Sequence, residues 1–595
     1  MHDYTPPLRH MRFVLNELLD HGAIQDLPRW NDAGADLVNA VLEEAGRFAS
    51  GVLAPLNRAG DRQGCRLSNG AVTTPQGFPD AYQQSVDNGW NSLSCSTEHG
   101  GQGLPGCVAT ATQEMWHAAN MAFALCPMLT AGAIEAIEQH GSPEQQRLYL
   151  PRLISGEWTG TMNLTEPQAG TDLAAVVTRA VPDGDRYRLY GQKIYITWGE
   201  HDCAANIVHL VLARTPDAPA GVKGLSLFIV PKCLPDDNGE AGERNDVRCV
   251  SIEHKLGIHG SPTCTMVFGE HNGAIGDLIG EEGQGLACMF TMMNEARHKV
   301  GVEGLSISDR ALQQARAYAN DRVQGRPAGA SGHSAQAIIH HPDVRRMLLT
   351  MQAGVEAMRC LCYYAAWCMD LGREAPDQPS RAAHSARADL LIPIVKGWCT
   401  ELSQELTSVG LQVHGGMGYI EDTGAAQHLR DARITAIYEG TTAIQGNDLI
   451  GRKTYRDRGK AIKTLAGELR TDADALGAIP AMAHLDDRLR SALDDLDTAA
   501  DWIVAHHGTQ PAATAASAVP YLMQAGYVIG GGLMARAARR AHDALAADPD
   551  DAAFYTARID VARYYLEQLL PRANGLLPAV LSGQLVAEIN VEVLE

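Results

Sequence analysis

The stretch Ala436-Ile437-Tyr438-Glu439-Gly440-Thr441-Thr442-Ala443-Ile444-Gln445-Gly446-Asn447 places one acidic side chain, Glu439, between an apolar approach and a polar turn. Gly440 removes Cβ bulk directly after the acid, so the backbone can approach a ligand closely there. The hydroxyl and amide groups that follow can bind polar atoms of a cofactor. Taken alone, the stretch also fits a helix start with Thr441 or Thr442 as N-cap. Its interpretation therefore depends on the rest of the chain.

Two further blocks lie where helical periodicity gives way to short strands. The first is Met162-Asn163-Leu164-Thr165-Glu166-Pro167-Gln168-Ala169-Gly170-Thr171-Asp172. Its hydroxyls, backbone amides and Gly suit hydrogen bonding to a polar ligand, although a Pro/Gly turn entering a sheet has the same composition. The second is the strand Lys193-Ile194-Tyr195-Ile196-Thr197. The period of two places Tyr195 and Thr197 on one face of that strand, where an aromatic is more often core than site.

Three blocks follow in regions with helical periodicity. Asn294-Glu295-Ala296-Arg297 opens a long predicted helix, and Tyr318-Ala319-Asn320-Asp321-Arg322-Val323-Gln324-Gly325 ends it. A glycine-rich turn comes later, at Gln412-Val413-His414-Gly415-Gly416-Met417-Gly418-Tyr419. Each would mean little on its own.

Together, and in this order, these blocks resemble the signature of the acyl-CoA dehydrogenase family, over roughly residues 80 to 450. The start of the chain, residues 254–263 and the C-terminal helical segment are similar to a long branch of that family with an extra C-terminal domain. The resemblance implies FAD-dependent α,β-dehydrogenation of an acyl-CoA thioester, with electrons passed to an external acceptor such as electron-transfer flavoprotein. It also implies that Glu439 is the catalytic base.

An acyl α-C–H is too weak an acid for a free carboxylate, so the thioester carbonyl must be polarised and water excluded while Glu439 removes the proton. The resemblance assigns that polarisation to the Glu439 backbone N–H and a flavin ribityl hydroxyl. The β-hydrogen then leaves as hydride to the flavin.

The resemblance also assigns the remaining site residues. For FAD they are Met162, Leu164, Thr165, Gly170, Thr171, Tyr195, Thr197, Arg322, Gln412, Gly415, Gly416 and Thr441. For the substrate they are Thr171, Asn294, Arg297 and Gly440, and no metal is expected. Thr171 replaces the family's Ser, Ala443 replaces a Gln of many relatives, and the Arg322 segment lacks the family's Phe. Because the family's counterparts of Arg322 and Gly415-Gly416 serve a neighbour's flavin, a homo-oligomer is expected, most simply a dimer.

The pattern predicts a multidomain α+β chain. Helical periodicity covers residues 1–160 as an N-terminal α-helical domain. Short strands separated by turns predict an antiparallel middle β-barrel or sandwich over 161–280. Long apolar helices predict a helical bundle with the base over 281–455 and an extra C-terminal helical domain over 465–595. In that last domain Leu485, Leu489, Leu493, Leu496, Ala500 and Ile503 form one stripe.

The composition of the chain restricts the classes of binding partner and the compartment that we expect. The 595 residues carry a net charge of −21, which disfavours nucleic acid as a partner. The start lacks the layout of a signal peptide, no apolar run approaches the roughly 18 residues of a membrane span, and thirteen unpatterned cysteines fit a reducing compartment. We therefore expect a cytoplasmic enzyme without a transmembrane segment.

Two alternatives stay open at this point. An acyl-CoA oxidase would share the fold and the base but pass electrons to oxygen. A non-enzymatic, nucleic-acid-binding flavoprotein on the same fold is disfavoured by the negative charge. The sequence leaves acyl chain length, branching and thioether preference undetermined.

Overall fold

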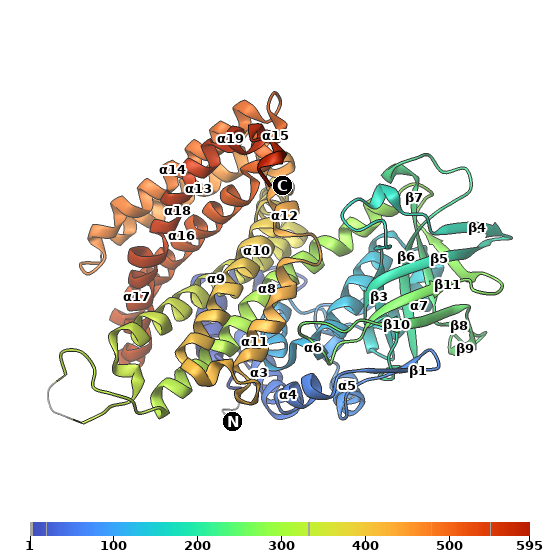
Figure 1. The fold of residues 1–595 in the computed structure, drawn as a ribbon, viewed down its shortest axis with the longest axis horizontal. Coiled ribbons are helices and arrows are strands. Elements are labelled where there is room, and N and C mark those ends of the chain that lie inside the picture. The colour runs from blue at the N-terminus through green and yellow to red at the C-terminus, as the bar shows by residue number, and fades with distance from the viewer. Residues whose placement is uncertain (1–3, 20, 331–333, 478, 548, 595) are drawn as a thin grey trace. The chain divides into compact units, whose positions relative to one another are not determined.

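The computed structural model describes residues 4–19, 21–330, 334–477, 479–547 and 549–594. Contacts divide the chain into two compact units (Figure 1). One, the helical unit, contains Met1–Gly46, Pro105–Ala118 and Arg297–Glu595. The other, the barrel unit, contains Arg47–Leu104 and Ala119–Ala296. The predicted domain boundaries thus do not coincide with the two units, because each unit takes chain from the N-terminal third.

The barrel unit is built on one sheet with the strand order β10-β11-β5-β12-β7-β6-β3. β4 pairs with both β5 and β6, which closes β5, β12, β7, β6 and β4 into a ring. The predicted barrel is therefore confirmed. It is not purely antiparallel, however, because β3 runs parallel to β6. The strands are β3 Trp158–Asn163, β4 Arg179–Asp183, β5 Arg186–Thr197, β6 Asn206–Arg214, β7 Leu225–Pro231, β10 Val247–Ile252, β11 Thr263–Phe268 and β12 Ala274–Ile279.

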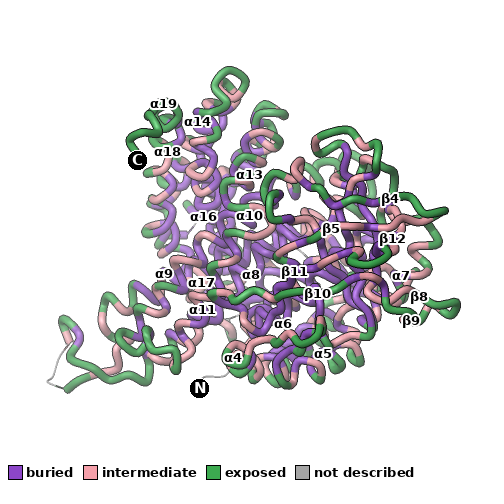
Figure 2. Tube along the Cα trace, turned by 45° about the vertical axis from the view of Figure 1, so that its right-hand side comes forward, coloured by how far each residue is buried: buried purple, intermediate pink, exposed green. Residues whose placement is uncertain are grey.

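Apolar side chains from several strands fill the barrel, among them Val211, Phe228, Val230 and Phe268. Every residue of β7 is buried, and the tube of Figure 2 shows such segments in purple. Helices of this unit include α4 Ala54–Gln63, α5 Phe78–Asp87 and α7 Pro143–Ser155, which begins at a capping box on Ser142. Two hairpins complete it: β1 Arg66–Ser68 with β2 Ala71–Thr73, and β8 Cys233–Pro235 with β9 Ala241–Arg244. The charge pattern of residues 236–246 predicts a solvated loop, and the second hairpin occupies part of that segment.

Long helices form the helical unit. α8 runs over Gly285–Asp321 and enters the unit at Arg297, and it is followed by α9 Pro342–Glu374 and α10 Gln378–Val413, which pack along each other. The shorter α11 Ala425–Ala432 and α12 Thr442–Asp448 follow. The C-terminal helices are α13 Lys460–Leu476, α14 Asp486–His506, α15 Pro511–Ala516, α16 Ala518–Ala547, α17 Ala552–Tyr564, α18 Pro571–Leu581 and α19 Gly583–Glu588.

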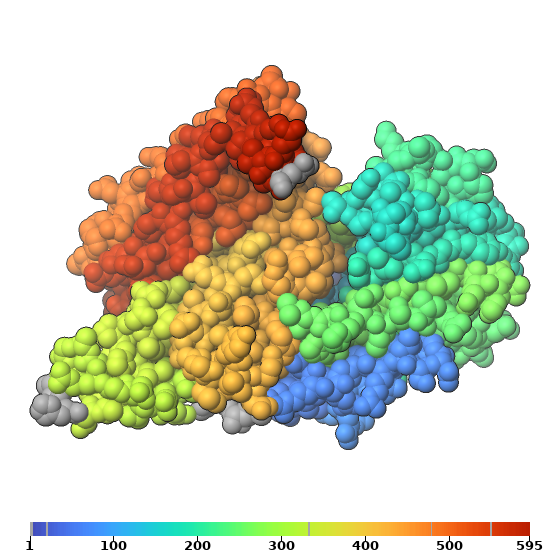
Figure 3. All heavy atoms as spheres, viewed as in Figure 1, coloured from blue at the N-terminus to red at the C-terminus, as the bar shows by residue number. Residues whose placement is uncertain are grey.

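The C-terminal helices pack directly on the bundle. α16 contacts α9, α10 and α12 within the helical unit, and Figure 3 shows the orange and red C-terminal segments against the yellow ones. The predicted stripe on α14 is fully buried. It faces α13, α16 and α18, so its apolar surface is covered by the other C-terminal helices.

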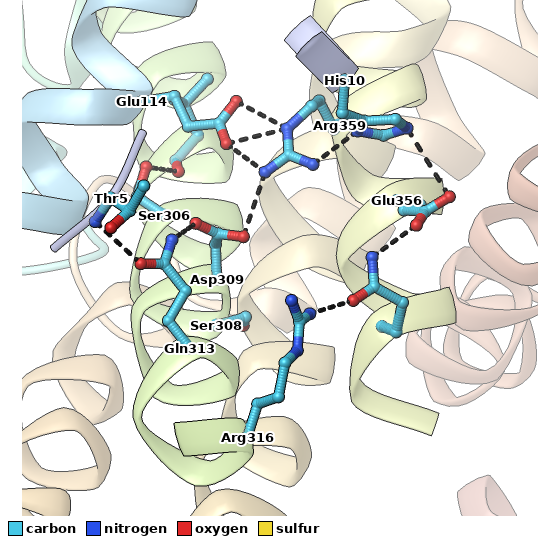
Figure 4. Close-up of polar contacts among 12 residues, drawn as sticks. Thr5, His10, Glu114, Ser306, Ser308, Asp309, Gln313, Arg316, Glu356 and Arg359 are labelled. Carbon is cyan, nitrogen blue, oxygen red and sulfur yellow. Dashed lines mark hydrogen bonds and ion pairs between the residues drawn. The ribbon is translucent and has the colours of Figure 1, made fainter. Parts of the chain in front are cut away.

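A buried ion network ties the start of the chain to this bundle (Figure 4). Arg359 on α9 donates from Nη2 to Glu114 on α6, Gly106–His140, at 2.6 Å, and from Nη1 to Nδ1 of His10 at 2.7 Å. On the same helix, Glu356 accepts from Arg558 of α17 at 2.7 Å. Because the His10 ring accepts from a guanidinium, it is neutral, and burial holds its pKa well below the usual value.

One helix departs from a sequence expectation. α6, Gly106–His140, is long and apolar enough to cross a membrane by length and composition. The expectation that no run approaches a membrane span was therefore wrong for α6, since its many Ala residues disguise its apolar character. Within the described chain, 83% of its most apolar window is buried, as in the core helix of a globular fold. The helix also contains a non-helical residue, Asn120.

Candidate active site

Glu439 lies in a turn between two helical segments, η10 Arg433–Ala436 and α12. Its φ of +56° is in the left-handed region, which a non-glycine residue occupies only when its surroundings enforce it. Gly440 follows with φ +91°, and a Cβ there would lie 2.8 Å from Nε2 of Gln445. The turn therefore requires glycine at position 440, and it presents the Glu439 side chain on a strained, defined backbone.

Side chains from two helices hold this turn by its carbonyl groups. Nζ of Lys396 on α10 donates to the Gly440 carbonyl at 2.7 Å, and Nε2 of Gln445 donates to the Glu439 carbonyl at 3.2 Å. Thr441 accepts from the Ile444 N–H at 3.4 Å as the N-cap of α12. The capping interpretation is thus correct for Thr441. Within the described chain, no acceptor is bonded to the Glu439 N–H, which leaves that donor available.

The electrostatics of Glu439 suit a base. Burial raises the pKa of its carboxyl, and the nearby charges of Arg297 and Lys396 oppose that rise. Arg297 on α8 is itself buried, with Nη1 3.6 Å from an oxygen of Asp448. Burial lowers the pKa of Arg297 and brings that of Lys396 to about 8. A half-buried carboxylate with two cations nearby can hold a negative charge and still accept a proton.

Glycines on α8 explain how Lys396 comes within reach. A Cβ on Gly301 would lie 2.3 Å from Cγ1 of Val395, and one on Gly304 would lie 2.8 Å from the Cys399 carbonyl oxygen. The two helix backbones therefore approach closely at these positions. This contact brings the α8 side chains beside the α10 residues that hold the Glu439 turn.

Sequence reasoning missed Lys396 and Glu303, which both interact with the residues of this turn. The signal was present: each is a single charged residue inside an apolar helical segment, and such a residue is rarely buried without a partner. The sequence also predicts that a helix opens at Asn294 to Arg297, whereas α8 begins earlier, at Gly285. Glycines near Gly285 disguised that start.

The block at residues 162–172 lies in the barrel unit. Met162 is buried in β3, and Leu164 and Thr165 follow it half-buried. Glu166 accepts from Nζ of Lys193 at 2.8 Å and from backbone amides of Val177 and Thr178. The buried ion pair of Glu166 and Lys193, together with these backbone hydrogen bonds, holds the segment that follows β3 in place. Beyond it, Gly170 and Thr171 are exposed, and a Cβ on Gly170 would meet nothing within 4 Å.

Tyr195 and Thr197 lie on β5 in the same unit. The register with β11 shifts between Lys193 and Ile196, which marks a bulge. Tyr195 within it has φ +60° and is 60% exposed, whereas Ile196 is buried. Thr197 is half-buried. The aromatic ring is therefore not core, which was the simpler interpretation of the sequence.

The other predicted residues come from other parts of the sequence than the Glu439 turn. Gln412 is exposed near the end of α10, Gly415 and Gly416 are exposed in the following turn η8, Gly415–Tyr419, and Arg322 is exposed just past α8. No interaction in the described chain joins them to Glu439. Asn294 belongs to the barrel unit. The structure thus brings together Glu439, Gly440, Thr441 and Arg297.

Comparisons with known proteins identify the same regions. The chain matches the acyl-CoA dehydrogenase N-terminal domain at 38–157, middle domain at 161–270 and C-terminal domain at 283–453, and an acetyl-CoA dehydrogenase C-terminal-like domain at 461–588. It is 47% identical to 3-methylmercaptopropionyl-CoA dehydrogenase of Ruegeria pomeroyi, over 96% of this chain and 97% of the relative. It is 34% identical to a butyryl-CoA dehydrogenase of Syntrophomonas wolfei, over 97% of each chain. A Bacillus anthracis acyl-CoA dehydrogenase structure complexed with FAD shares the fold, with TM-score 0.75, 20% identity, and coverage of 98% of this chain and 93% of that one.

Proposed function

The chain belongs to the acyl-CoA dehydrogenase family, and from this premise we propose that it oxidises an acyl-CoA thioester to the 2-enoyl-CoA with FAD as its cofactor. The observation that carries the proposal is the Glu439 turn. It combines a left-handed glutamate, two buried cations and an unbonded backbone N–H at one position. An oxidoreductase of this family needs these features in a base that must act on a weak carbon acid.

In the proposed reaction, each residue of the Glu439 turn and its surroundings has a separate role. The Glu439 carboxylate removes the α-proton, and its free backbone N–H polarises the thioester carbonyl. Arg297 and Lys396 keep Glu439 ionised before the transfer by opposing the effect of burial. Bound FAD supplies the acceptor for the β-hydrogen as hydride. Because Lys396 and Gln445 hold the turn by its carbonyls, the carboxylate and the N–H keep a fixed mutual orientation.

The residues assigned to FAD fit such a ligand. Gly170 and Thr171 leave backbone and hydroxyl exposed, and the Tyr195 ring is turned outward. At Gly415 and Gly416 a Cβ would meet nothing in the chain within 4 Å. These groups are not used up by internal packing, so they are available to a flavin nucleotide.

We propose a short acyl chain as the substrate class. Two of the relatives that match over almost the whole chain carry the names 3-methylmercaptopropionyl-CoA dehydrogenase and butyryl-CoA dehydrogenase. The first experiment measures turnover of the FAD-loaded enzyme on a panel of acyl-CoAs, including a thioether, with electron-transfer flavoprotein as acceptor. Glu439→Gln is the control. Absence of turnover on every member would contradict the proposal, and rapid reoxidation by air with product bound would indicate an oxidase instead.

We also propose a homodimer that forms through the surface around Gly415. Apolar side chains are exposed there: Met417 (50%), Tyr419 (84%) and Ile420 (48%). Such a patch beside glycines with open space supports contact with a second copy of the chain. Light scattering after gel filtration is expected to give twice the chain mass, and Tyr419→Glu to shift it toward the monomer. A monomeric wild-type protein with full activity would show that this patch serves another purpose.

A further inference from the structure

A second carboxyl group, Glu303 on α8, is buried beside the Glu439 turn. Its side chain has no exposed surface. Oε2 accepts the hydroxyl of Tyr438, the residue directly before Glu439. Oε1 is buried and has no hydrogen-bond partner. A carboxylate with one unbonded, desolvated oxygen is costly to keep ionised, so the group calls for an explanation beyond packing.

The charged groups that face Glu303 are Glu439, from the turn, and Lys396, from α10. Lys396 in turn faces Glu401 of α10 and Arg297 of α8. The close approach of α8 and α10 at Gly301 and Gly304 is what brings these groups together. Lys396 and Gln445 hold the peptide of the turn through its carbonyl groups, whereas Glu303 bonds the Tyr438 side chain.

We propose that Glu303 is a positioning residue for Glu439: it anchors the Tyr438 ring and sets the proton affinity of the neighbouring Glu439 carboxylate through its own charge. The inference rests on the proposed function, because it assigns Glu439 as the base. The two residues are linked through Tyr438, because its hydroxyl donates a hydrogen bond to Glu303 and Tyr438 directly precedes Glu439 in the chain.

The direction of the effect follows from burial and charge. Burial raises the pKa of Glu303 to about 8, so at neutral pH it is protonated and places no charge beside Glu439. Above that pH, a proton leaves the Glu303 group and a second negative charge appears beside Glu439. Like charges raise each other's proton affinity, so Glu439 becomes a stronger base at alkaline pH.

The kinetic test is the pH profile of kcat for the FAD-loaded enzyme. In wild type we expect a step of about threefold between pH 7 and 9, because a stronger base removes the α-proton faster. In Glu303→Gln the step should shrink, since the amide keeps the size but does not ionise, and of these two groups only Lys396, whose pKa is also about 8, still titrates in this range. A variant profile that is parallel to wild type at every pH would overturn the proposal, because a purely structural role lowers kcat uniformly.

Two further variants sharpen the result. Tyr438→Phe removes the hydroxyl bond that lowers the pKa of Glu303, so the step should move to higher pH. Glu401→Gln removes a carboxylate that faces the same lysine but bonds Thr442 instead, and it should leave the step in place. If Glu401→Gln moves the step as far as Glu303→Gln does, the assignment to Glu303 is wrong.

A stability measurement separates this inference from the enzymatic one. A carboxyl whose pKa rises from 4.5 to about 8 on folding contributes stability below the lower value and loses it as pH rises through the upper one. The Tm of wild type relative to Glu303→Gln should therefore fall by a few degrees between pH 5 and 8. This holds even if the protein turns over no acyl-CoA. A Tm difference that stays constant over that range would refute the protonation state on which the proposal depends.

Discussion

A glutamate with positive φ has to be held in place by its neighbours, and at Glu439 those neighbours are identifiable. Lys396 and Gln445 bond the carbonyl groups of the turn, and Gly440 tolerates its own left-handed geometry. The strain is local, of the order of 1–3 kcal/mol for such a residue. It is offset by these bonds and by the helix cap at Thr441. The carboxylate is therefore presented with little freedom to reorient.

The first prediction concerns Glu439→Gln. The amide keeps size and hydrogen bonding, so fold and flavin content should survive, but it cannot accept the α-proton. We expect kcat to fall by roughly 10⁴-fold, the upper end for a general base in a closed site. The dissociation constant of an enoyl-CoA product should change little, because the loss lies in the transition state. Retention of more than about a tenth of wild-type kcat would mean that another group is the base.

At the residue scale, the sequence predicts those site residues that belong to a contiguous motif, and few others. Glu439 and Gly440 were identifiable because their neighbours form a distinctive string. Lys396 and Glu303 come from helices distant in sequence, and their proximity depends on how closely α8 and α10 pack. That packing is set by Gly301 and Gly304 against particular carbonyl groups, which periodicity does not reveal. Burial of a lone charge in an apolar helix was the one available signal.

At the scale of elements, the contact between α8 and α10 should be sensitive to single methyl groups. Gly301→Ala would place a Cβ 2.3 Å from Val395, so the helices must separate. We expect a loss of about 1–3 kcal/mol in the free energy of unfolding, as for an overpacked core, together with lower kcat.

The matched control is Gly467→Ala on α13, where a Cβ meets nothing within 4 Å. Ala is the better helix former there, so this change should raise stability by about 0.5–1 kcal/mol. Denaturant unfolding measures both. Equal effects for the two variants would show that the α8–α10 contact is looser than the distances indicate.

The buried network around Arg359 supplies a second prediction for the elements. Arg359→Met leaves the Glu114 carboxylate buried without its cation, at a cost of about 3–5 kcal/mol. The control is Arg346→Met, which removes an exposed partner of Asp343 and should cost less than about 1 kcal/mol. A small effect of Arg359→Met would mean that Glu114 takes up a proton or finds another partner.

Strand and helix positions were largely predictable because their periodicities are strong. The alternation predicts strands over 207–213, 225–230 and 263–268, and the structure has β6 at Asn206–Arg214, β7 at Leu225–Pro231 and β11 at Thr263–Phe268. Pairing was less predictable. The parallel contact of β3 with β6 and the ring closure through β4 depend on long-range contacts that alternation does not encode. The hairpin of β8 and β9 was missed because its strands have only three and four residues.

At the scale of the molecule, the C-terminal helices are part of the helical unit and not an independent appendage. α16 approaches α10 so closely that a Cβ on Gly526 would lie 2.1 Å from Trp398. A Cβ on Gly446 of α12 would likewise lie 2.7 Å from the Ala518 carbonyl oxygen. α10 supplies Lys396, and α12 begins at the Glu439 turn. The extra domain therefore supports the two helices that position the base.

The last prediction follows from that support. Truncation before Lys460 would expose Trp398, which is fully buried in the intact chain, together with the apolar residues around it. We expect aggregation or loss of activity, measured by light scattering and turnover. Because a deletion can fail simply by misfolding, Gly526→Val tests the same contact in the full chain: its side chain must push α16 from α10 and disturb Lys396, so kcat should fall while flavin stays bound. A soluble, fully active truncation would show that α10 and α12 hold the Glu439 turn without the C-terminal helices.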